Sequence, residues 1–222
     1  MPGAPAAGRL RRALPGPLYL VTDRKQTGGR PLVDVVEAAL RGGARLVQLR
    51  EKDLSGLALT QLGDEVRAAT RRHGALLLVN DRVDVALAVE ADGAHLAGTS
   101  MRPEDVRPLL GPDRWIGASV HSLAQAKAAE AGGADFVAFG PVFETPSKAP
   151  YGPPVGLDAL RAAKRALSIP ILAIGGIMAE NLAQVARAGA DGFAVISAIL
   201  ADPDPESAAR NLLHTWEAAV HP

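Results

Sequence analysis

Positively charged side chains follow an apolar run near residue 50. The run Arg45–Arg50 (RLVQLR) continues to Lys52. Because strand side chains alternate between two faces, Gln48, Arg50 and Lys52 lie on one side. An Arg fork and a Lys ammonium both suit phosphate oxygens. The pattern indicates an anion site, although a solvated strand end gives the same pattern when it occurs alone.

Further residues that could contact a ligand stand where other apolar runs end. They are Asn80, Asp81, Ser119, His121, Thr145, Ser147, Lys148, Gly175, Gly176, Ile196 and Ser197. Lys148 and its neighbouring hydroxyls lie in a loop between two prolines, which could close over a ligand.

Several of these residues allow two interpretations. Asp81 suits Mg²⁺, which commonly takes one or two carboxylates plus substrate phosphates, but Asp also caps helices. Gly175 and Gly176 could present backbone N–H groups to a phosphate, or could simply form a tight turn. His121 could transfer protons, or serve as a core or capping residue. The loops after the last two strands together favour phosphate binding.

The elements that must position these residues are short apolar runs separated by helical segments. Continuous apolar runs indicate strands buried on both faces, as in parallel sheets covered by helices. The predicted strands are Leu18–Asp23, Arg45–Arg50, Ala75–Asp81, Gly93–Leu96, Trp115–His121, Asp135–Gly140, Pro170–Gly175 and Gly192–Ser197. The predicted helices are Leu32–Arg41, Leu57–His73, Arg82–Ala88, Pro103–Leu110, Leu123–Ala131, Leu157–Leu167, Ala179–Ala188 and Pro205–Ala219.

Eight strand–helix units predict an α/β fold, a single (β/α)8 TIM barrel, in which catalytic groups sit at the carboxyl ends of the strands. A doubly wound sheet is the rival fold. It usually carries a glycine-rich fingerprint after its first strand, where this chain reads VTDRKQTGG. We therefore predict a flexible leader over residues 1–17 and one barrel domain over 18–222.

Composition narrows the function further. The chain has 24 basic and 24 acidic residues, which argues against a nucleic-acid or membrane surface. It has no cysteine, which excludes disulfides and thiolate chemistry and is compatible with a cytoplasmic location. The five histidines show no zinc spacing. Small molecules are the expected partners, and a homo-oligomer is compatible with the sequence.

Separated motifs carry a family resemblance. They are QLREK, VND, GASVHS, GADFVAFGPVFETPSK, IPILAIGGI and AGADGFAVISAI. In this order they resemble thiamine-phosphate synthases and the related thiazole tautomerases, from Tyr19 to about Leu200. The synthase reaction implied by the resemblance joins hydroxymethylpyrimidine diphosphate to thiazole phosphate and releases diphosphate.

The resemblance implies a role for each site residue. Asp81 matches a Mg²⁺ ligand, and Ser119, His121 and Lys148 match residues with a catalytic role. The pyrimidine diphosphate would be held by Gln48, Arg50, Lys52 and Asn80, with Ser119 and Lys148 on its diphosphate. The thiazole phosphate would be held by Thr145, Ser147, Gly176, Ile196 and Ser197.

One departure from the synthase pattern concerns the metal. Ser100 stands where synthases usually carry a second Mg²⁺ carboxylate, so metal affinity should fall unless Glu104 or Asp105 reaches in. This loss, Glu144 in place of a usual proline, and His121 favour a thiazole tautomerase. The retained QLREK and VND motifs favour the synthase, which we take as the leading prediction. A tautomerase that aromatises thiazole carboxylate phosphate, or a non-catalytic thiazole phosphate-binding relative, remains the alternative.

Overall fold

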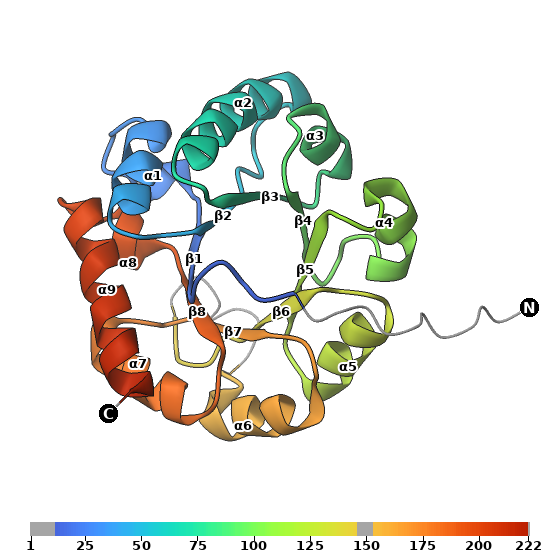
Figure 1. The fold of residues 1–222 in the computed structure, drawn as a ribbon, viewed down its shortest axis with the longest axis vertical. Helices are drawn as coiled ribbons and strands as arrows, with labels where there is room; N and C mark the ends of the chain where they lie inside the picture. The colour runs from blue at the N-terminus through green and yellow to red at the C-terminus, as the bar shows by residue number, and fades with distance from the viewer. Residues whose placement is uncertain (1–11, 146–152, 222) are drawn as a thin grey trace, which may run out of the picture.

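The chain folds into a closed parallel barrel (Figure 1). The computed structural model describes residues 12–145 and 153–221. Within these ranges eight strands pair in chain order, and β8 pairs with β1. The strands are β1 Leu18–Val21, β2 Leu46–Leu49, β3 Leu76–Asn80, β4 Gly93–Leu96, β5 Trp115–Val120, β6 Phe136–Phe139, β7 Ile171–Ile174 and β8 Gly192–Val195. The prediction of a single (β/α)8 TIM barrel is confirmed.

Helices form an outer layer around the barrel (Figure 1). They are α1 Leu32–Arg41, α2 Gly56–Arg72, α3 Val83–Ala88, α4 Pro103–Leu110, α5 Leu123–Ala131, α6 Gly156–Ala166, α7 Ala179–Arg187, α8 Ser197–Leu200 and α9 Pro205–Val220. A 3-10 turn, η1 Arg24–Gln26, follows β1. All the carboxyl ends of the strands therefore lie at one end of the barrel, which we call the C-terminal rim.

Strand alternation divides the apolar side chains between two cores. In β2, Val47 and Leu49 pack outward against the helices, whereas Leu46 joins a smaller cluster inside the barrel. Gln48 also points inward, because its side chain bonds to Tyr19 of that inner cluster. Polar side chains therefore point into the barrel interior even from strands whose sequences are otherwise apolar.

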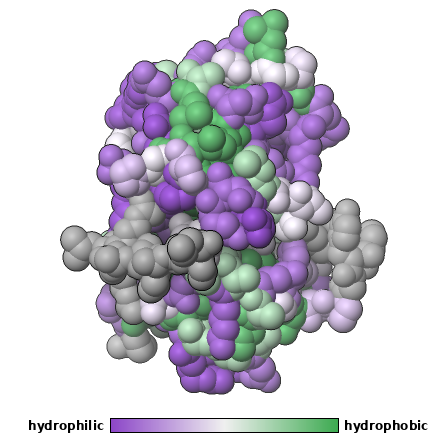
Figure 2. Space-filling view, turned by 90° about the vertical axis from the view of Figure 1, so that its right-hand side faces the viewer, coloured by the Kyte–Doolittle hydropathy of each residue, from purple (hydrophilic) through white to green (hydrophobic). Residues whose placement is uncertain are grey.

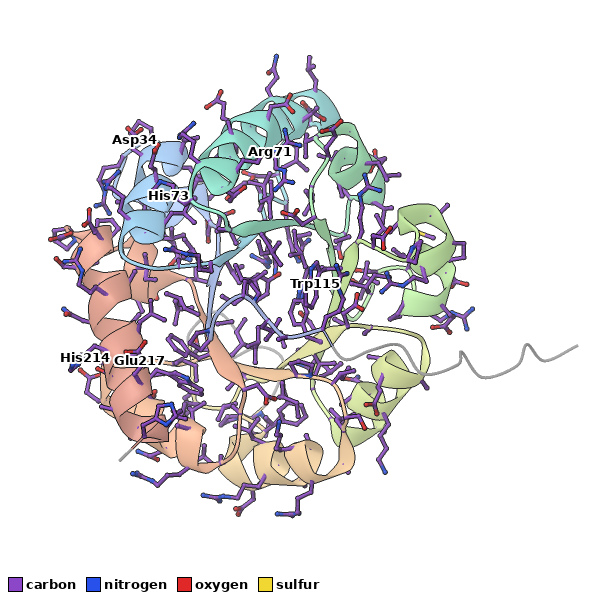
Figure 3. All side chains as sticks on the ribbon, viewed as in Figure 1. Asp34, Arg71, His73, Trp115, His214 and Glu217 are labelled. Carbon is purple, nitrogen blue, oxygen red and sulfur yellow. The ribbon has the colours of Figure 1, made fainter. Side chains whose placement is uncertain are left out.

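Residues 12–17 lie across the opposite, N-terminal end of the barrel. The Arg12 guanidinium stacks 4.6 Å from the centre of the Trp115 ring, and Arg12 Nη1 donates to the Asp113 carbonyl at 2.6 Å. Trp115 points toward the barrel axis (Figure 3). Leu14 packs against the inner cluster, and Phe193 N–H donates to the Pro17 carbonyl at 2.8 Å. This part of the predicted leader therefore covers the end of the barrel remote from the C-terminal rim.

The outer surface is mainly polar. Hydrophilic side chains cover most of the face in Figure 2, with apolar side chains gathered in smaller areas between them. No helix in the described part of the chain is both long enough and apolar enough to span a membrane. Of the histidines, His73 and His214 lie on the outer helical layer, away from the barrel axis (Figure 3).

Candidate active site

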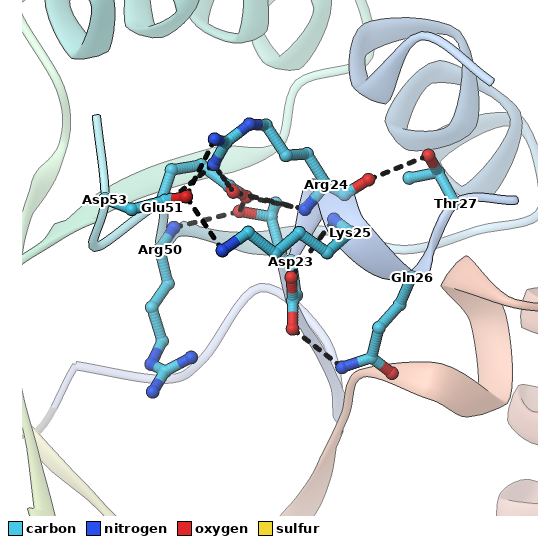
Figure 4. A network of polar contacts seen from close by, with 9 residues as sticks. Asp23, Arg24, Lys25, Gln26, Thr27, Arg50, Glu51 and Asp53 are labelled. Carbon is cyan, nitrogen blue, oxygen red and sulfur yellow. Dashed lines mark hydrogen bonds and ion pairs between the residues drawn. The ribbon is translucent and has the colours of Figure 1, made fainter. Parts of the chain in front are cut away.

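Arg50 presents an unpaired cation at the C-terminal rim. Its backbone N–H donates to Thr22 Oγ1 at 2.9 Å, which fixes where the side chain leaves the strand. The guanidinium extends away from the neighbouring charged network (Figure 4). It makes no hydrogen bond or ion pair with any residue that the structure describes, and the residue is half-buried. A half-buried Arg fork with this freedom can bind a diphosphate or carboxylate.

Glu51 holds the segment that positions Arg50. Its carboxylate is 5% exposed and accepts from Thr22 Oγ1 at 2.7 Å and from Arg24 N–H at 3.1 Å. The Arg24 guanidinium is also bound to Glu51 and forms two hydrogen bonds with Asp53, whose pKa it lowers (Figure 4). Arg24 is therefore occupied by carboxylates. The sequence shows Glu51 only as one charge among several, because its burial depends on the β1–α1 loop folding over it.

Lys52, the third member of the predicted cluster, is exposed. Across residues 12–145 and 153–221 its side chain has no ion-pair partner. Lys25, by contrast, pairs with Asp53 at 2.8 Å. Lys52 and Arg50 thus remain available to an anion, whereas the cations of η1 do not.

Asp81 has a left-handed backbone, with φ of 59°. Its Oδ2 accepts from Asn80 Nδ2 at 2.8 Å, and its Oδ1 accepts from Ala97 N–H at 3.0 Å and from the Ser100 hydroxyl. A short polar side chain that bonds locally makes this conformation tolerable. Ser100 therefore lies directly against Asp81, so a carboxylate at position 100 would face the same point in space.

Neither Glu104 nor Asp105 takes the place of a carboxylate at Ser100. Glu104 and Asp105 both pair with Arg102, at 3.3 and 2.9 Å, and Glu104 Oε2 lies against Gly132. The described residues contain no group of three or more His, Asp or Glu side chains that could hold a metal. The condition set for strong metal binding, that one of these two residues reaches in, is not met.

Two hard-oxygen groups nevertheless meet here, the Asp81 carboxylate and the Ser100 hydroxyl, whereas Asn80 turns its amide nitrogen toward Asp81. Mg²⁺ usually keeps several waters and is held by one or two carboxylates plus substrate phosphates. The set therefore fits Mg²⁺ that arrives with a phosphorylated substrate better than an ion held by the protein alone.

A buried hydrogen-bond chain lies inside the barrel beneath the rim. Gln48 Nε2 donates to Tyr19 Oη at 2.9 Å, and Tyr19 Oη lies 3.1 Å from His95 Nδ1. His95 Nε2 lies 2.8 Å from Ser119 Oγ. Burial lowers the pKa of His95 to about 4; the Asp81 carboxylate opposes the shift and Arg50 adds to it. Arg50 and Asp81 follow the adjacent strands β2 and β3, in which Leu49 pairs with Val79, so both lie at the same part of the rim.

Sequence reasoning assigned no role to Tyr19 or His95. Each occupies an inward position of an apolar strand, in LYLV and GAHL. The available signal was a polar aromatic side chain within each run, and strand alternation directs both side chains inward.

His121 lies at the end of β5 and is exposed. Its Nδ1 contacts the Gly140 carbonyl at the end of β6, and its backbone N–H donates to Gln125 Oε1 at 2.7 Å. The imidazole is thus anchored at the rim by one nitrogen. The side chain that caps α5 is Ser122, and the proton-transfer role of His121 stays a prediction.

The two glycines after β7 form a tight turn against the β6–α6 segment. Gly175 and Gly176 have φ of 95° and 65°. A Cβ at Gly175 would lie 2.4 Å from Pro141 Cβ, and one at Gly176 would lie 2.6 Å from the Glu144 carbonyl oxygen. These close contacts explain why glycine is needed at both positions, and the phosphate-binding role of this turn stays a prediction.

Other predicted phosphate ligands lie nearby along the rim. Ile196 turns the chain out of β8, and the exposed Ser197 begins α8, whose first N–H groups have no partner within the helix. Thr145 is half-buried in the β6–α6 segment. Ser147 and Lys148 lie outside the described residues.

Comparisons with known proteins agree with this arrangement. The family model described as thiamine monophosphate synthase matches residues 18–199. A protein of Geobacter sulfurreducens is 56% identical over 196 residues, covering 88% of this chain and 92% of its own length. The thiamine-phosphate synthase of Roseiflexus castenholzii is 49% identical over 197 residues, covering 89% of this chain and 86% of that protein.

A solved structure gives the same result. Thiamine phosphate pyrophosphorylase from Pyrococcus furiosus is 40% identical, with a TM-score of 0.84, and the match covers 91% of this chain and 96% of that chain. The family model, the relatives and the fold all agree. This chain belongs to the thiamine monophosphate synthase family.

Proposed function

We propose that the protein is a thiamine-phosphate synthase, which joins hydroxymethylpyrimidine diphosphate to thiazole phosphate and releases diphosphate. The observation that carries the proposal is the position of Arg50 and Asp81, an unpaired cation and a hard-oxygen ligand that follow the adjacent strands β2 and β3, where Leu49 pairs with Val79. Relatives that share this whole barrel bear the name of that activity.

The reaction is a substitution at the pyrimidine methylene carbon. The bond from this carbon to the diphosphate oxygen breaks, and both bonding electrons leave with the oxygen. The pyrimidine-methyl cation that remains is captured by the lone pair of the thiazole nitrogen, which forms the new C–N bond. No proton has to move, so the main task of the protein is to stabilise the departing anion.

We assign that task to the cations of the rim. Arg50 and Lys52 would bind the diphosphate. Ser119 and Lys148 would contact the same diphosphate. Gln48 and Asn80 would contact the pyrimidine diphosphate beside them. Asp81 would hold Mg²⁺, which when bound supplies Lewis-acid stabilisation of the diphosphate. The thiazole phosphate would lie against Gly176, with Thr145, Ser147, Ile196 and Ser197 around it.

One observation favours a second candidate, a thiazole tautomerase. Ser100 occupies the position of the second carboxylate, and Glu104 and Asp105 pair with Arg102 instead of replacing it. A tautomerase needs no diphosphate site, so it would tolerate that loss. His121 would be its proton-transfer residue.

The test is product formation by the purified protein from the two phosphorylated substrates with Mg²⁺. We expect thiamine phosphate and diphosphate in equal amounts, abolished in Asp81→Ala and retained in His121→Ala. Asp84→Ala is the matched control, since Asp84 is exposed and pairs only with Arg82 in the described structure. Tautomer conversion lost in His121→Ala, with no thiamine phosphate, would establish the tautomerase. Thiazole phosphate binding without either turnover would identify a non-catalytic relative.

A further inference from the structure

We propose that the chain Gln48–Tyr19–His95–Ser119 is directional, and that it commits the Ser119 hydroxyl to donate its hydrogen bond to an acceptor atom of the substrate. Tyr19 and His95 are then positioning residues that act through Ser119, and the Gln48 amide nitrogen sets the direction of their hydrogen bonds. The identity of the substrate rests on the proposed function, whereas the direction of the chain is a property of the protein alone.

The chain crosses the barrel interior through four strands. It runs from β2 to β1, then to β4 and β5, with successive separations of 2.9, 3.1 and 2.8 Å. Gln48, Tyr19 and His95 are 3%, 0% and 1% exposed. Water therefore cannot easily substitute for any of these three partners, and each hydrogen bond constrains the next.

The direction follows from counting donors. The Gln48 amide nitrogen only donates, so Tyr19 Oη accepts this bond. Among the described residues the buried hydroxyl has one other partner, His95 Nδ1, so its hydrogen goes there. With Nδ1 as acceptor, a neutral imidazole carries its hydrogen on Nε2 and donates it to Ser119 Oγ. The Ser119 hydrogen is then left for another acceptor. His95 is 1% exposed and both of its ring nitrogens have neutral hydrogen-bond partners, which favours the neutral ring.

The ring of His95 has little room to turn. The Tyr19 and Phe136 rings lie 5.6 and 5.9 Å from it between centres. A Cβ at Gly117 would lie only 2.6 Å from His95 Nδ1, so the absence of a side chain there makes the space that the ring fills. The two nitrogens are thus held toward their separate partners.

Ser119 differs from the other three residues because it is half-buried at the end of β5. Apart from His95 Nε2, its hydroxyl has no hydrogen-bond partner in the described part of the chain, so a hydroxyl that accepts from His95 has its hydrogen left for a ligand. The Arg50 guanidinium, which has no partner among the described residues, lies at the same C-terminal rim. An oxygen of the pyrimidine diphosphate would accept from Ser119 while the diphosphate pairs with that cation. The reverse direction would turn the Ser119 hydrogen inward and offer the substrate only a lone pair.

The first experiment reads the tautomer of His95 by NMR of the free protein labelled with ¹⁵N-histidine at pH 7. The His95 signals are assigned by their absence in His95→Gln. We expect one neutral tautomer with hydrogen on Nε2. Hydrogen on Nδ1, or on both nitrogens, would overturn the proposal, and this readout needs no substrate.

The second experiment is a double-mutant cycle on kcat/KM for the pyrimidine diphosphate. Tyr19→Phe keeps the ring and removes the donor to His95. We expect about a tenfold loss in the otherwise native protein and less than about a twofold further loss in Ser119→Ala, because Tyr19 acts only through Ser119. Leu172→Ala is the control: Leu172 belongs to the same inner cluster but makes no side-chain hydrogen bond, and its effect should be equal in both backgrounds.

The outcomes separate the two proposals. An undiminished effect of Tyr19→Phe in Ser119→Ala would overturn the relay while leaving the synthase activity in place. If no variant, nor the native protein, makes product, the proposed function fails and the NMR result still decides the direction of the chain.

Discussion

Ser100→Asp tests how the metal is held. The Ser100 hydroxyl contacts Asp81 Oδ1, so the new carboxylate would stand within about 4 Å of an existing one. Two like charges at that separation repel by about 4 kcal/mol at an effective dielectric constant of 20. Both residues are half-buried, so solvent reduces the cost. We expect the metal-free variant to lose about 2 kcal/mol of unfolding free energy.

Mg²⁺ should reverse this loss, since the ion would lie between two carboxylates. A gain of about 1.4 kcal/mol in metal binding corresponds to a tenfold lower half-saturating Mg²⁺ concentration. The assay is thermal unfolding of the substrate-free protein, first in a chelator and then across a Mg²⁺ titration. We expect at least about a tenfold shift in the midpoint of that titration.

Ser100→Asn is the matched control, because it has almost the same shape as Ser100→Asp and no charge. It should show neither the loss of stability in chelator nor the gain in Mg²⁺ response. If Ser100→Asp and Ser100→Asn respond to Mg²⁺ alike, Asp81 and position 100 do not share an ion, and the metal assignment is refuted.

Three further predictions concern stability. Burial holds the pKa of His95 near 4, below its ordinary 6.5, so the neutral ring stabilises the fold above pH 6.5 and this stabilisation is lost as the pH falls toward 4. In metal-free urea unfolding between pH 7 and 5, the unfolding free energy of the unmutated protein should fall by about 2 kcal/mol more than that of His95→Gln. Equal losses in the two proteins would contradict this. Gly176→Ala should lower the unfolding free energy by about 2 kcal/mol or more, because the new Cβ meets the Glu144 carbonyl. Gly74→Ala is the control: Gly74 has φ of 60° but open space around it, so the loss should be only about 1 kcal/mol. Similar losses for the two variants in chemical denaturation would refute the close approach at Gly176. Gly93→Ala places a Cβ 2.0 Å from a backbone oxygen of β5 and should cost about 3 kcal/mol or more, so a native-like melting temperature would show that β4 and β5 are packed differently.

Much of the fold could be predicted because each element carries its own local signal. The helices Leu32–Arg41, Pro103–Leu110 and Leu123–Ala131 were predicted with the bounds that the structure gives. Strand ends were predicted too far, as for Gly192–Ser197, where β8 ends at Val195. Apolar residues continue into α8, and a helix of one turn is too short to show periodicity.

The candidate site was predictable where it depends on the barrel itself. Since parallel strands place their carboxyl ends together, Arg50 and Asp81 could be assigned to one rim. The polar interior could not be found in this way, because Tyr19 and His95 become partners only when four strands close around them. Glu51 was likewise hidden, since the β1–α1 loop is what buries it.

The central claim is that one cavity at the C-terminal rim binds both phosphorylated substrates. A crystal structure with Mg²⁺, the pyrimidine diphosphate and a thiazole phosphate tests it most directly. We predict the diphosphate against Arg50 and Asp81, and the thiazole phosphate against Gly176 in the same cavity. Ligands in separate cavities, or in the open cavity of about 450 Å³ at the N-terminal end beside Trp216 and Glu217, would contradict the account.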